Sequence, residues 1–272
     1  MNSLTETEGI NHEEPQRSYS AGRYSNSPIQ QWERHYQALK SPPSVIADWW
    51  TVSSWKKNLF APVFRELEGK LVVDVGCGTA ARIAAIVPIE TYKYRYLGID
   101  SSFDALKRAA VNMPGGTFVR ADLGRFQLKS GMADLLLCLG VLMYFDDCIT
   151  ILERFLEILK PGGFLLLHEQ IQRRSWSNAI RHLFPIKPDV FPSAHGVGRQ
   201  ELCNYLARRG TVVHAHLAGS PLRRLSMKIL DGSPLESVRP LAALCDSWWC
   251  ATAGRVWPAV GASELQILFR KN

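Results

Sequence analysis

Two glycines that follow an apolar run give the first indication of chemistry in this sequence. Residues 72–81 read VVDVGCGTAA, and Gly76 and Gly78 stand where the apolar run gives way to a helix-like stretch. Glycine lets a backbone turn sharply and come close to a ligand, because it has no Cβ. Read from Gly76 to Ala81, the segment also fits the G-x-G-x-x-A pattern of dinucleotide-binding turns. The turn predicts a nucleotide-type cofactor and leaves its identity open.

Three aspartates near this turn narrow the choice. Asp74 lies two residues before Gly76, where a dinucleotide-binding strand is normally apolar, and its carboxylate could receive an ammonium group, which a nicotinamide dinucleotide lacks. Asp100 ends the run YLGID, where an acidic side chain can accept hydrogen bonds from both hydroxyls of a ribose. Asp122 in VRADL could accept from the exocyclic amine of an adenine, with the Leu123 amide close to the ring.

The elements that must position these residues alternate between strands and helices. The pattern predicts strands at 71–75, 94–99, 117–120, 133–138 and 164–168, and helices at 80–87, 103–112 and 148–159. This βαβ rhythm indicates a doubly wound α/β fold with helices on both faces of a mostly parallel sheet. Further along we expect helices at 199–209, 222–230 and 238–250, and strands at 211–216 and 264–269 that complete a seven-stranded sheet.

Five segments resemble, in order and spacing, the motifs of class I S-adenosylmethionine-dependent methyltransferases. VVDVGCGTA matches the family's D-x-G-x-G-x-G motif with Ala80 in place of the third glycine, a change expected to cost little because a methyl barely obstructs the approach of the backbone. GID with Ser101–Ser102–Phe103 is similar to the second motif, and RADL to the adenine motif. ADLLLCLGVLMYFDD resembles the fourth strand and the segment after it, and LKPGGFLLL the turn that opens the fifth. The resemblance covers roughly residues 69–170.

This resemblance implies a Rossmann-like enzyme that binds S-adenosylmethionine and transfers its methyl group by in-line displacement. The cofactor is expected across the carboxyl ends of the first, second and fourth strands, where the strand order reverses. The residues expected to contact it are, from the methionine end through the ribose to the adenine, Asp74, Gly76, Cys77, Gly78, Asp100, Ser101, Asp122 and Leu123. Leu139 would pass near the reactive sulfur, and no metal is expected.

Four residues are candidates on the acceptor side. His168 and Glu169 end the fifth strand at the rim of the expected pocket, and either could act as a general base for a hydroxyl acceptor. Tyr144 follows the fourth strand, where family members place acceptor contacts, and His195 lies in the Pro/Gly-rich stretch 185–198. Each of them also has a simpler interpretation as a packed or hydrogen-bonded structural residue.

The remaining segments suggest a lid and a cover around this site. Residues 1–28 are rich in polar residues and predict a flexible arm. Residues 29–69 predict an aromatic-rich helical lid with Trp32 and Tyr36 on one helix face, core packing being the alternative. Residues 70–272 then form the methyltransferase domain, with a substrate-side insertion at 170–210 and a C-terminal cover.

This layout favours a small-molecule, lipid-like or carrier-bound acceptor, methylated on oxygen in preference to nitrogen or carbon. The chain has no long Lys/Arg-rich arm, and CLGV at 138–141 replaces the N-P-P-Y tetrapeptide that in the resembling families marks amino groups of bases or protein amides. A nucleic-acid partner is therefore not expected. The alternatives are a non-catalytic S-adenosylmethionine-binding interaction subunit, a methyltransferase acting on protein or nucleic acid, and, more distantly, a nicotinamide oxidoreductase.

Charge and composition add further expectations. The net charge is +7, and residues 171–272 hold 14 Lys/Arg against 6 Asp/Glu. Within them LRRLSMKIL at 222–230 could rest on an anionic membrane surface or hold a carrier-bound substrate, a solvated basic surface being the alternative. Six cysteines without a CxxC fit neither a zinc site nor a disulfide framework. With no apolar signal segment and no run long enough to span a bilayer, a soluble cytoplasmic protein is expected.

Overall fold

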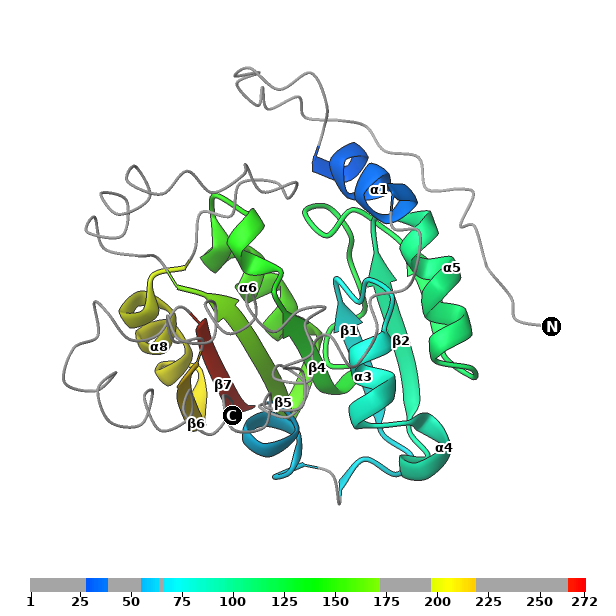
Figure 1. Cartoon of the computed structure of the whole chain (residues 1–272). Helices are drawn as coiled ribbons and strands as arrows, with labels where there is room; N and C mark the ends of the chain where they lie inside the picture. The colour runs from blue at the N-terminus through cyan, green and yellow to red at the C-terminus, as the bar shows by residue number, and fades with distance from the viewer. Residues whose placement is uncertain (1–27, 39–54, 64–65, 172–196, 219–263) are drawn as a thin grey trace, which may run out of the picture.

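The computed structural model describes residues 28–38, 55–63, 66–171, 197–218 and 264–272, and the fold and the site are built from these residues alone. Their strands form one seven-stranded sheet in the order β3-β2-β1-β4-β5-β7-β6 (Figure 1). The strands are β1 (Leu71–Val75), β2 (Arg95–Asp100), β3 (Thr117–Arg120), β4 (Ala133–Leu139), β5 (Leu159–Gln170), β6 (Gly210–Ala218) and β7 (Glu264–Lys271). Among these strands only β7 runs antiparallel to its neighbours, so the carboxyl ends of β1 to β5 meet at one edge.

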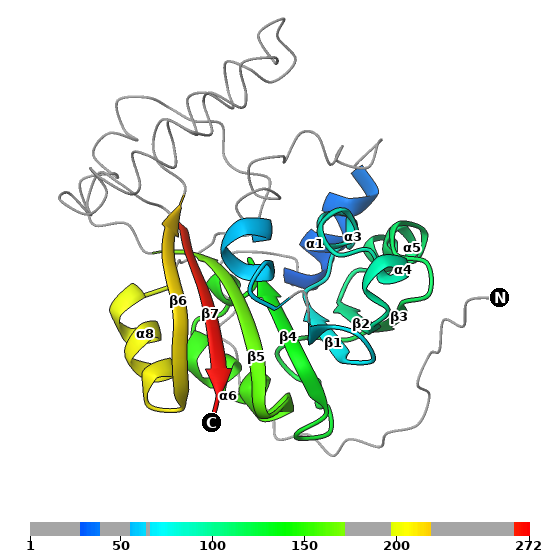
Figure 2. The same ribbon diagram turned by 90° about the horizontal axis from the view of Figure 1, so that it is seen from below.

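Helices cover both faces of this sheet, as the βαβ rhythm predicted (Figure 2). One face carries α6 (Cys148–Ile158) and α8 (Arg199–Ala207). The other carries α3 (Ala81–Ile86), α5 (Phe103–Asn112) and the π-helical turn η2 (Lys56–Phe60). The short helices α4 (Ile89–Tyr92) and η4 (Leu142–Tyr144) lie in connections.

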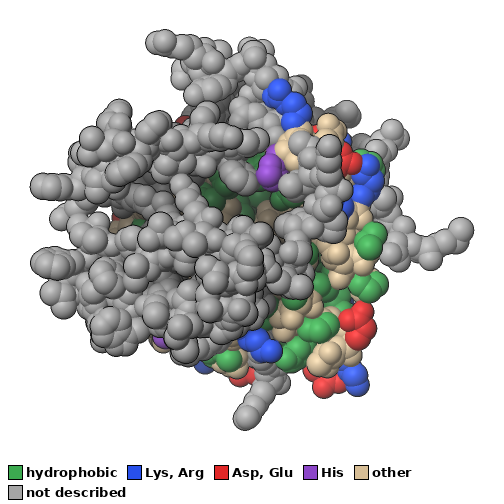
Figure 3. Space-filling model, viewed as in Figure 1, with side chains coloured by type: hydrophobic (Ala, Val, Ile, Leu, Met, Phe, Trp, Pro, Cys, Tyr) green, Lys and Arg blue, Asp and Glu red, His purple; other side chains and the backbone are tan. Residues whose placement is uncertain are grey.

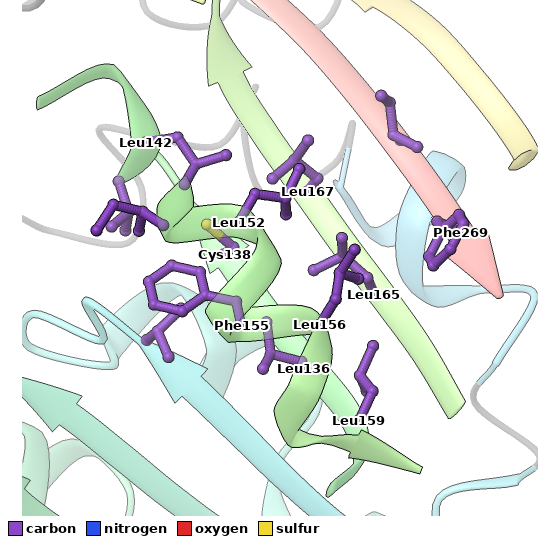
Figure 4. Packing of buried hydrophobic residues seen from close by; sticks show 14 of the residues in the cluster. Leu136, Cys138, Leu142, Leu152, Phe155, Leu156, Leu159, Leu165, Leu167 and Phe269 are labelled. Carbon is purple, nitrogen blue, oxygen red and sulfur yellow. The ribbon is translucent and has the colours of Figure 1, made fainter. Parts of the chain in front are cut away.

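The two faces have separate cores because side chains alternate along each strand. Val73 and Val75 of β1 pack toward α6, whereas Val72 packs toward α3 and α5. Figure 4 shows how α6, through Leu152 and Phe155, packs on the first of these faces. The polar side chains at the strand ends are therefore carried by strands that are packed on both faces.

The predicted elements are largely confirmed, with β5 as the main correction. The sequence placed the start of this strand at residue 164, after a turn made by Pro161, Gly162 and Gly163. The strand instead begins at Leu159, and those residues form an irregularity inside it, since the register with β4 shifts there. A Cβ at Gly163 would lie 2.9 Å from the Lys160 carbonyl oxygen, so the close chain crossing requires glycine.

The N-terminal helix α1 (Pro28–Ala38) packs against α5 (Figure 1). The Glu33 carboxylate accepts the Phe103 N–H at the start of α5, at 3.0 Å. The Arg108 guanidinium donates to the Tyr36 carbonyl oxygen, also at 3.0 Å. These contacts hold α1 at the end of the sheet where β1 and β2 end.

Several predictions lie outside the described residues: the arm up to residue 27, the helices at 222–230 and 238–250, and the stretch that contains His195. Within the part of the chain that is described, no helix is long and apolar enough to cross a membrane.

Candidate cofactor and acceptor site

The glycine turn after β1 is fixed to the end of β2. The amides of Gly76 and Cys77 both donate to the Ile99 carbonyl oxygen, at 2.8 and 3.0 Å. Gly76 and Gly78 have φ values of 72° and 53°, a region that favours glycine. A Cβ at Gly76 would lie 2.5 Å from a Val141 methyl, and one at Gly78 would lie 2.7 Å from the Tyr36 hydroxyl oxygen. The backbone conformation therefore favours glycine at both positions, and a Cβ would force the Val141 or the Tyr36 side chain to shift.

Ala80, the third position of the turn, carries a cost that the sequence did not indicate. It has a φ of 53°, in the left-handed region, and is buried. A residue with a Cβ loses about 1–2 kcal/mol in that conformation. The expectation that alanine matters only through its approach to a ligand is therefore corrected, because the cost lies in the backbone of Ala80 itself.

Asp100 joins the glycine turn to the start of α5. One carboxylate oxygen accepts the Gly78 N–H and the other the Ser102 N–H, each at 2.9 Å. Burial raises the pKa of Asp100, and these two N–H donors oppose the rise. Each carboxylate oxygen retains a second lone pair, so Asp100 can still accept from ribose hydroxyls. Ser101 lies in the same turn, where its carbonyl oxygen accepts from Arg120 at 3.1 Å.

Asp74 is buried beside the turn, and its carboxylate accepts the Tyr96 hydroxyl at 2.6 Å. Burial raises its pKa to about 7, the Tyr96 bond lowers it, and the charge of Asp100 raises it further. A cationic ligand group would stabilise the ionised form of Asp74, which suits the expected ammonium. Burial also raises the pKa of the neighbouring Cys77 thiol, which keeps it protonated and neutral.

The residues predicted to contact the adenine and the sulfur lie in the loop after β3 and at the last residue of β4. Asp122 accepts the Gly124 N–H at 2.8 Å, which fixes the loop after β3. The Leu123 side chain would contact a Cβ at Gly76 at 3.4 Å, so it lies over the same turn. Leu139 ends β4, next to β1 and β5. The expected cofactor residues are thus brought together around the carboxyl ends of β1, β2, β3 and β4.

Tyr36 lies at the candidate site, although the residues predicted to bind the cofactor did not include it. Its hydroxyl lies against Gly78, and burial and the nearby charge of Asp100 raise its pKa. Trp32, one helical turn earlier, stacks on Tyr36 and meets the Tyr144 ring edge-on at a centroid distance of 5.2 Å. The shared helix face of Trp32 and Tyr36 was visible in the sequence, but nothing in it indicated which surface that face covers.

His168 is placed near the site with both ring nitrogens engaged. The Trp55 indole N–H donates to its Nδ1 at 2.7 Å, so that nitrogen carries no proton. Its Nε2 faces the Glu264 carboxylate at 3.6 Å. A general-base role for His168 would require one of these contacts to open.

Glu169 has no exposed surface and points to the opposite face of β5. One oxygen accepts the N–H groups of Val141 and Leu142, at 3.0 and 2.9 Å, and the other accepts that of Met143 at 3.2 Å. Burial raises its pKa to about 7, and the three N–H donors oppose the rise. This geometry ties Glu169 to the loop after β4, so a general-base role would need that loop to release it.

Two further observations concern metal ligands and surface charge. Among the described side chains, no three His, Cys, Asp or Glu residues gather as a metal site would require. Figure 3 shows acidic and basic side chains interspersed on the coloured part of the visible face, without a patch of a single sign.

The comparisons with known proteins agree with this geometry. Residues 73–167 match the family model of a methyltransferase domain. A trans-aconitate 2-methyltransferase from Rhizobium leguminosarum is 38% identical over 94 residues, which are 34% of this chain and 36% of the relative. The chain thus matches about a third of the length of such curated relatives.

Solved structures show the same fold. An S-adenosylmethionine-dependent methyltransferase from Mesorhizobium loti aligns with a TM-score of 0.51 and 18% identity, covering 77% of this chain and 96% of that one. The [4+2]-cyclase SpnF aligns with a TM-score of 0.52 and 18% identity, covering 78% and 77%. Because the fold also supports a different reaction, the activity must be argued from the site.

The glycine turn, the Asp100 carboxylate and the strand order define a Rossmann-like cofactor-binding fold. Together with the family match, they show that this chain contains a class I S-adenosylmethionine-dependent methyltransferase domain.

Proposed function

We propose that this protein is an S-adenosylmethionine-dependent methyltransferase that methylates a carboxylate oxygen of a small-molecule acceptor. The observation that carries the cofactor assignment is the Asp100 carboxylate bonded to Gly78, in a turn whose two glycines have positive φ and no room for a Cβ. This donor and acceptor set fits a ligand that combines a ribose with an amino-acid end. When bound, the cofactor would supply a methyl group made electrophilic by its sulfonium.

The chain's own residues would bind and orient the two reactants. Asp100 would accept the ribose hydroxyls, Asp74 would pair with the ammonium, and Asp122 with Leu123 would hold the adenine. Positioning of this kind can contribute about 7–11 kcal/mol to lowering a barrier. The main work of the protein in this scheme is alignment and the exclusion of water.

Helix α1 and the loop after β4 would form the lid over this site. Tyr36 already lies at Gly78, and the Trp32 ring meets the Tyr144 ring edge-on. We place Tyr144 on the acceptor side, next to this aromatic pair. His195 retains its predicted acceptor role without structural support, since it lies outside the described residues.

A carboxylate acceptor fits the state of the two strand-end groups. His168 and Glu169 are each held by the protein itself, by Trp55 and by three backbone amides. A carboxylate is already a nucleophile at neutral pH and needs no base, whereas a hydroxyl acceptor gains from one. The relatives named trans-aconitate 2-methyltransferase act on a tricarboxylate, which supports the same class of acceptor.

The test uses S-adenosylmethionine labelled in its methyl group. The purified protein is incubated with trans-aconitate, other di- and tricarboxylates, phenols and a lipid extract, with Asp100→Ala as the inactive control. A carboxylate product is a methyl ester, so mild alkali releases its label as methanol. Label that resists alkali would show that a phenol oxygen or an amine nitrogen is methylated instead. Label in the lipid fraction would show that the acceptor is a lipid. Failure of the protein to bind S-adenosylhomocysteine would refute the cofactor assignment.

A further inference from the structure

Glu169 is a buried carboxylate that no proposed catalytic step uses. It belongs to β5 but bonds to a different segment, the loop that leaves β4. All three N–H donors that reach it are consecutive, from Val141, Leu142 and Met143. The Cys138 thiol lies 3.6 Å from the same oxygen that accepts from Val141 and Leu142.

These donors form the start of the 3-10 turn η4. Amides at the start of a helical turn have no partner within it, and a negative charge there is favourable. Gly140 adds a second tie, since its N–H donates to the His168 carbonyl oxygen at 2.6 Å. The loop is therefore fixed to the end of β5 at two consecutive positions. In Figure 4, Cys138 and Leu142 lie together at this end of the core.

The same loop forms part of both halves of the candidate site. Its Val141 methyl fills the space beside Gly76, in the cofactor turn. Its Tyr144, at the end of η4, meets Trp32 of α1 on the acceptor side. A change in the position of residues 141–143 would therefore move the Val141 and Tyr144 side chains, one in each half of the candidate site.

We infer that Glu169 is a positioning residue, whose carboxylate holds the loop 140–144 in the shape that cofactor binding and acceptor alignment require. This inference rests on the proposed function for its effect on ligands, but not for its effect on the loop. With no exposed surface, Glu169 acts through Val141 and Tyr144 and does not itself contact a reactant.

The experiment compares Glu169→Gln with a control, Asp134→Asn. Asp134 is a carboxylate near the start of β4, at the end of the sheet away from the candidate site. Like Glu169, Asp134 accepts from the backbone, in its case from a single N–H, that of Leu71 at 2.9 Å, and it pairs with Lys160. Glutamine keeps the size of Glu169 and one acceptor oxygen, but turns an NH2 group toward an N–H donor. Glu169→Asp, which keeps the charge and is one methylene too short, is the second variant in case the glutamine form does not fold.

Hydrogen exchange of residues 139–147 is the first readout, and it needs no ligand. Glu169→Gln should speed exchange of the three amides by roughly tenfold or more, with the β2 strand unchanged. Asp134→Asn should leave these amides as in the wild type. Unchanged exchange in Glu169→Gln, or in Glu169→Asp if the former does not fold, would overturn the inference.

Affinity for S-adenosylhomocysteine, measured by calorimetry, is the second readout. Glu169→Gln should weaken it roughly tenfold or more, while Asp134→Asn stays within about twofold of the wild type. Faster loop exchange with unchanged affinity would overturn the role of Glu169 in positioning ligands. Absence of binding by the wild type would refute the proposed function instead, and the exchange result would still decide whether Glu169 holds the loop.

Discussion

Replacing Asp100 by asparagine is the sharpest test of the cofactor site. Asparagine keeps the volume and one acceptor oxygen, which can stay on Ser102, but its NH2 group would face the Gly78 N–H. The variant also loses the charged carboxylate oxygens that would accept hydrogen bonds from the ribose hydroxyls. Hydrogen bonds to charged groups contribute about 1.5–3 kcal/mol each, so one lost bond weakens binding roughly 10- to 150-fold.

Thermal unfolding with and without S-adenosylhomocysteine measures this loss. At a ligand concentration about 1,000 times the wild-type Kd, binding stabilises the folded protein by about 4.1 kcal/mol. A variant that binds about 100-fold more weakly retains only about 1.4 kcal/mol under the same conditions. The ligand should therefore raise the Tm of Asp100→Asn by roughly a third of the amount by which it raises the Tm of the wild type.

The matched control is Asp147→Asn. Asp147 also accepts a backbone N–H, from Thr150 at 3.0 Å at the start of α6, and it is exposed and outside the candidate site. Its ligand-induced shift should equal that of the wild type. A full wild-type shift in Asp100→Asn would show that Asp100 does not bind the ribose, and the assignment of the site would fail.

Three further predictions concern the glycine turn and its neighbours. Gly76→Ala should abolish detectable S-adenosylhomocysteine binding, because its Cβ would lie 2.5 Å from the Val141 methyl. Gly115→Ala, also at positive φ but with nothing within 4 Å, should lower the unfolding free energy by about 1–2 kcal/mol and leave calorimetric affinity intact. Ala80→Val should cost about 2 kcal/mol in urea unfolding, since β-branching suits the left-handed region poorly, and an unaffected midpoint would contradict the strain. Because burial raises the pKa of Asp74 to about 7, S-adenosylhomocysteine affinity should rise roughly tenfold from about pH 6 to about pH 8 as the carboxylate ionises, and this rise should vanish in Asp74→Asn. The effect on stability has the opposite sign: the contribution of Asp74 is present below about pH 4 and is lost as the pH rises through about 7.

Local patterns in the sequence were enough to predict most of the elements and the glycine turn. The helix at 103–112 and the strand at 117–120 have the predicted bounds. Hydrophobic periodicity and glycine positions act over a few residues, so they can be recognised without knowing the fold. The order of the motifs then placed Asp74, Asp100 and Asp122 at strand ends, and the structure brings these ends to one edge.

The partners of the buried polar groups could not be predicted in the same way. Trp55 and His168 are 113 residues apart in the chain, and Glu169 reaches amides 26 to 28 residues before it. A sequence shows that such a residue can donate or accept, but not which distant group completes the bond. For this reason His168 and Glu169 were general-base candidates in the sequence, whereas the structure shows each of them bonded within the protein.

The sequence by itself determined the fold class, the glycine turn and the family of this domain, because those depend on short-range patterns and on spacing. Only the tertiary structure showed that Tyr36 closes on Gly78, that Ala80 is held in a left-handed conformation and that Glu169 bonds to the loop 140–144. These features arise where segments distant in the chain pack together, and packing is decided by the shape and hydrogen bonding of the folded molecule.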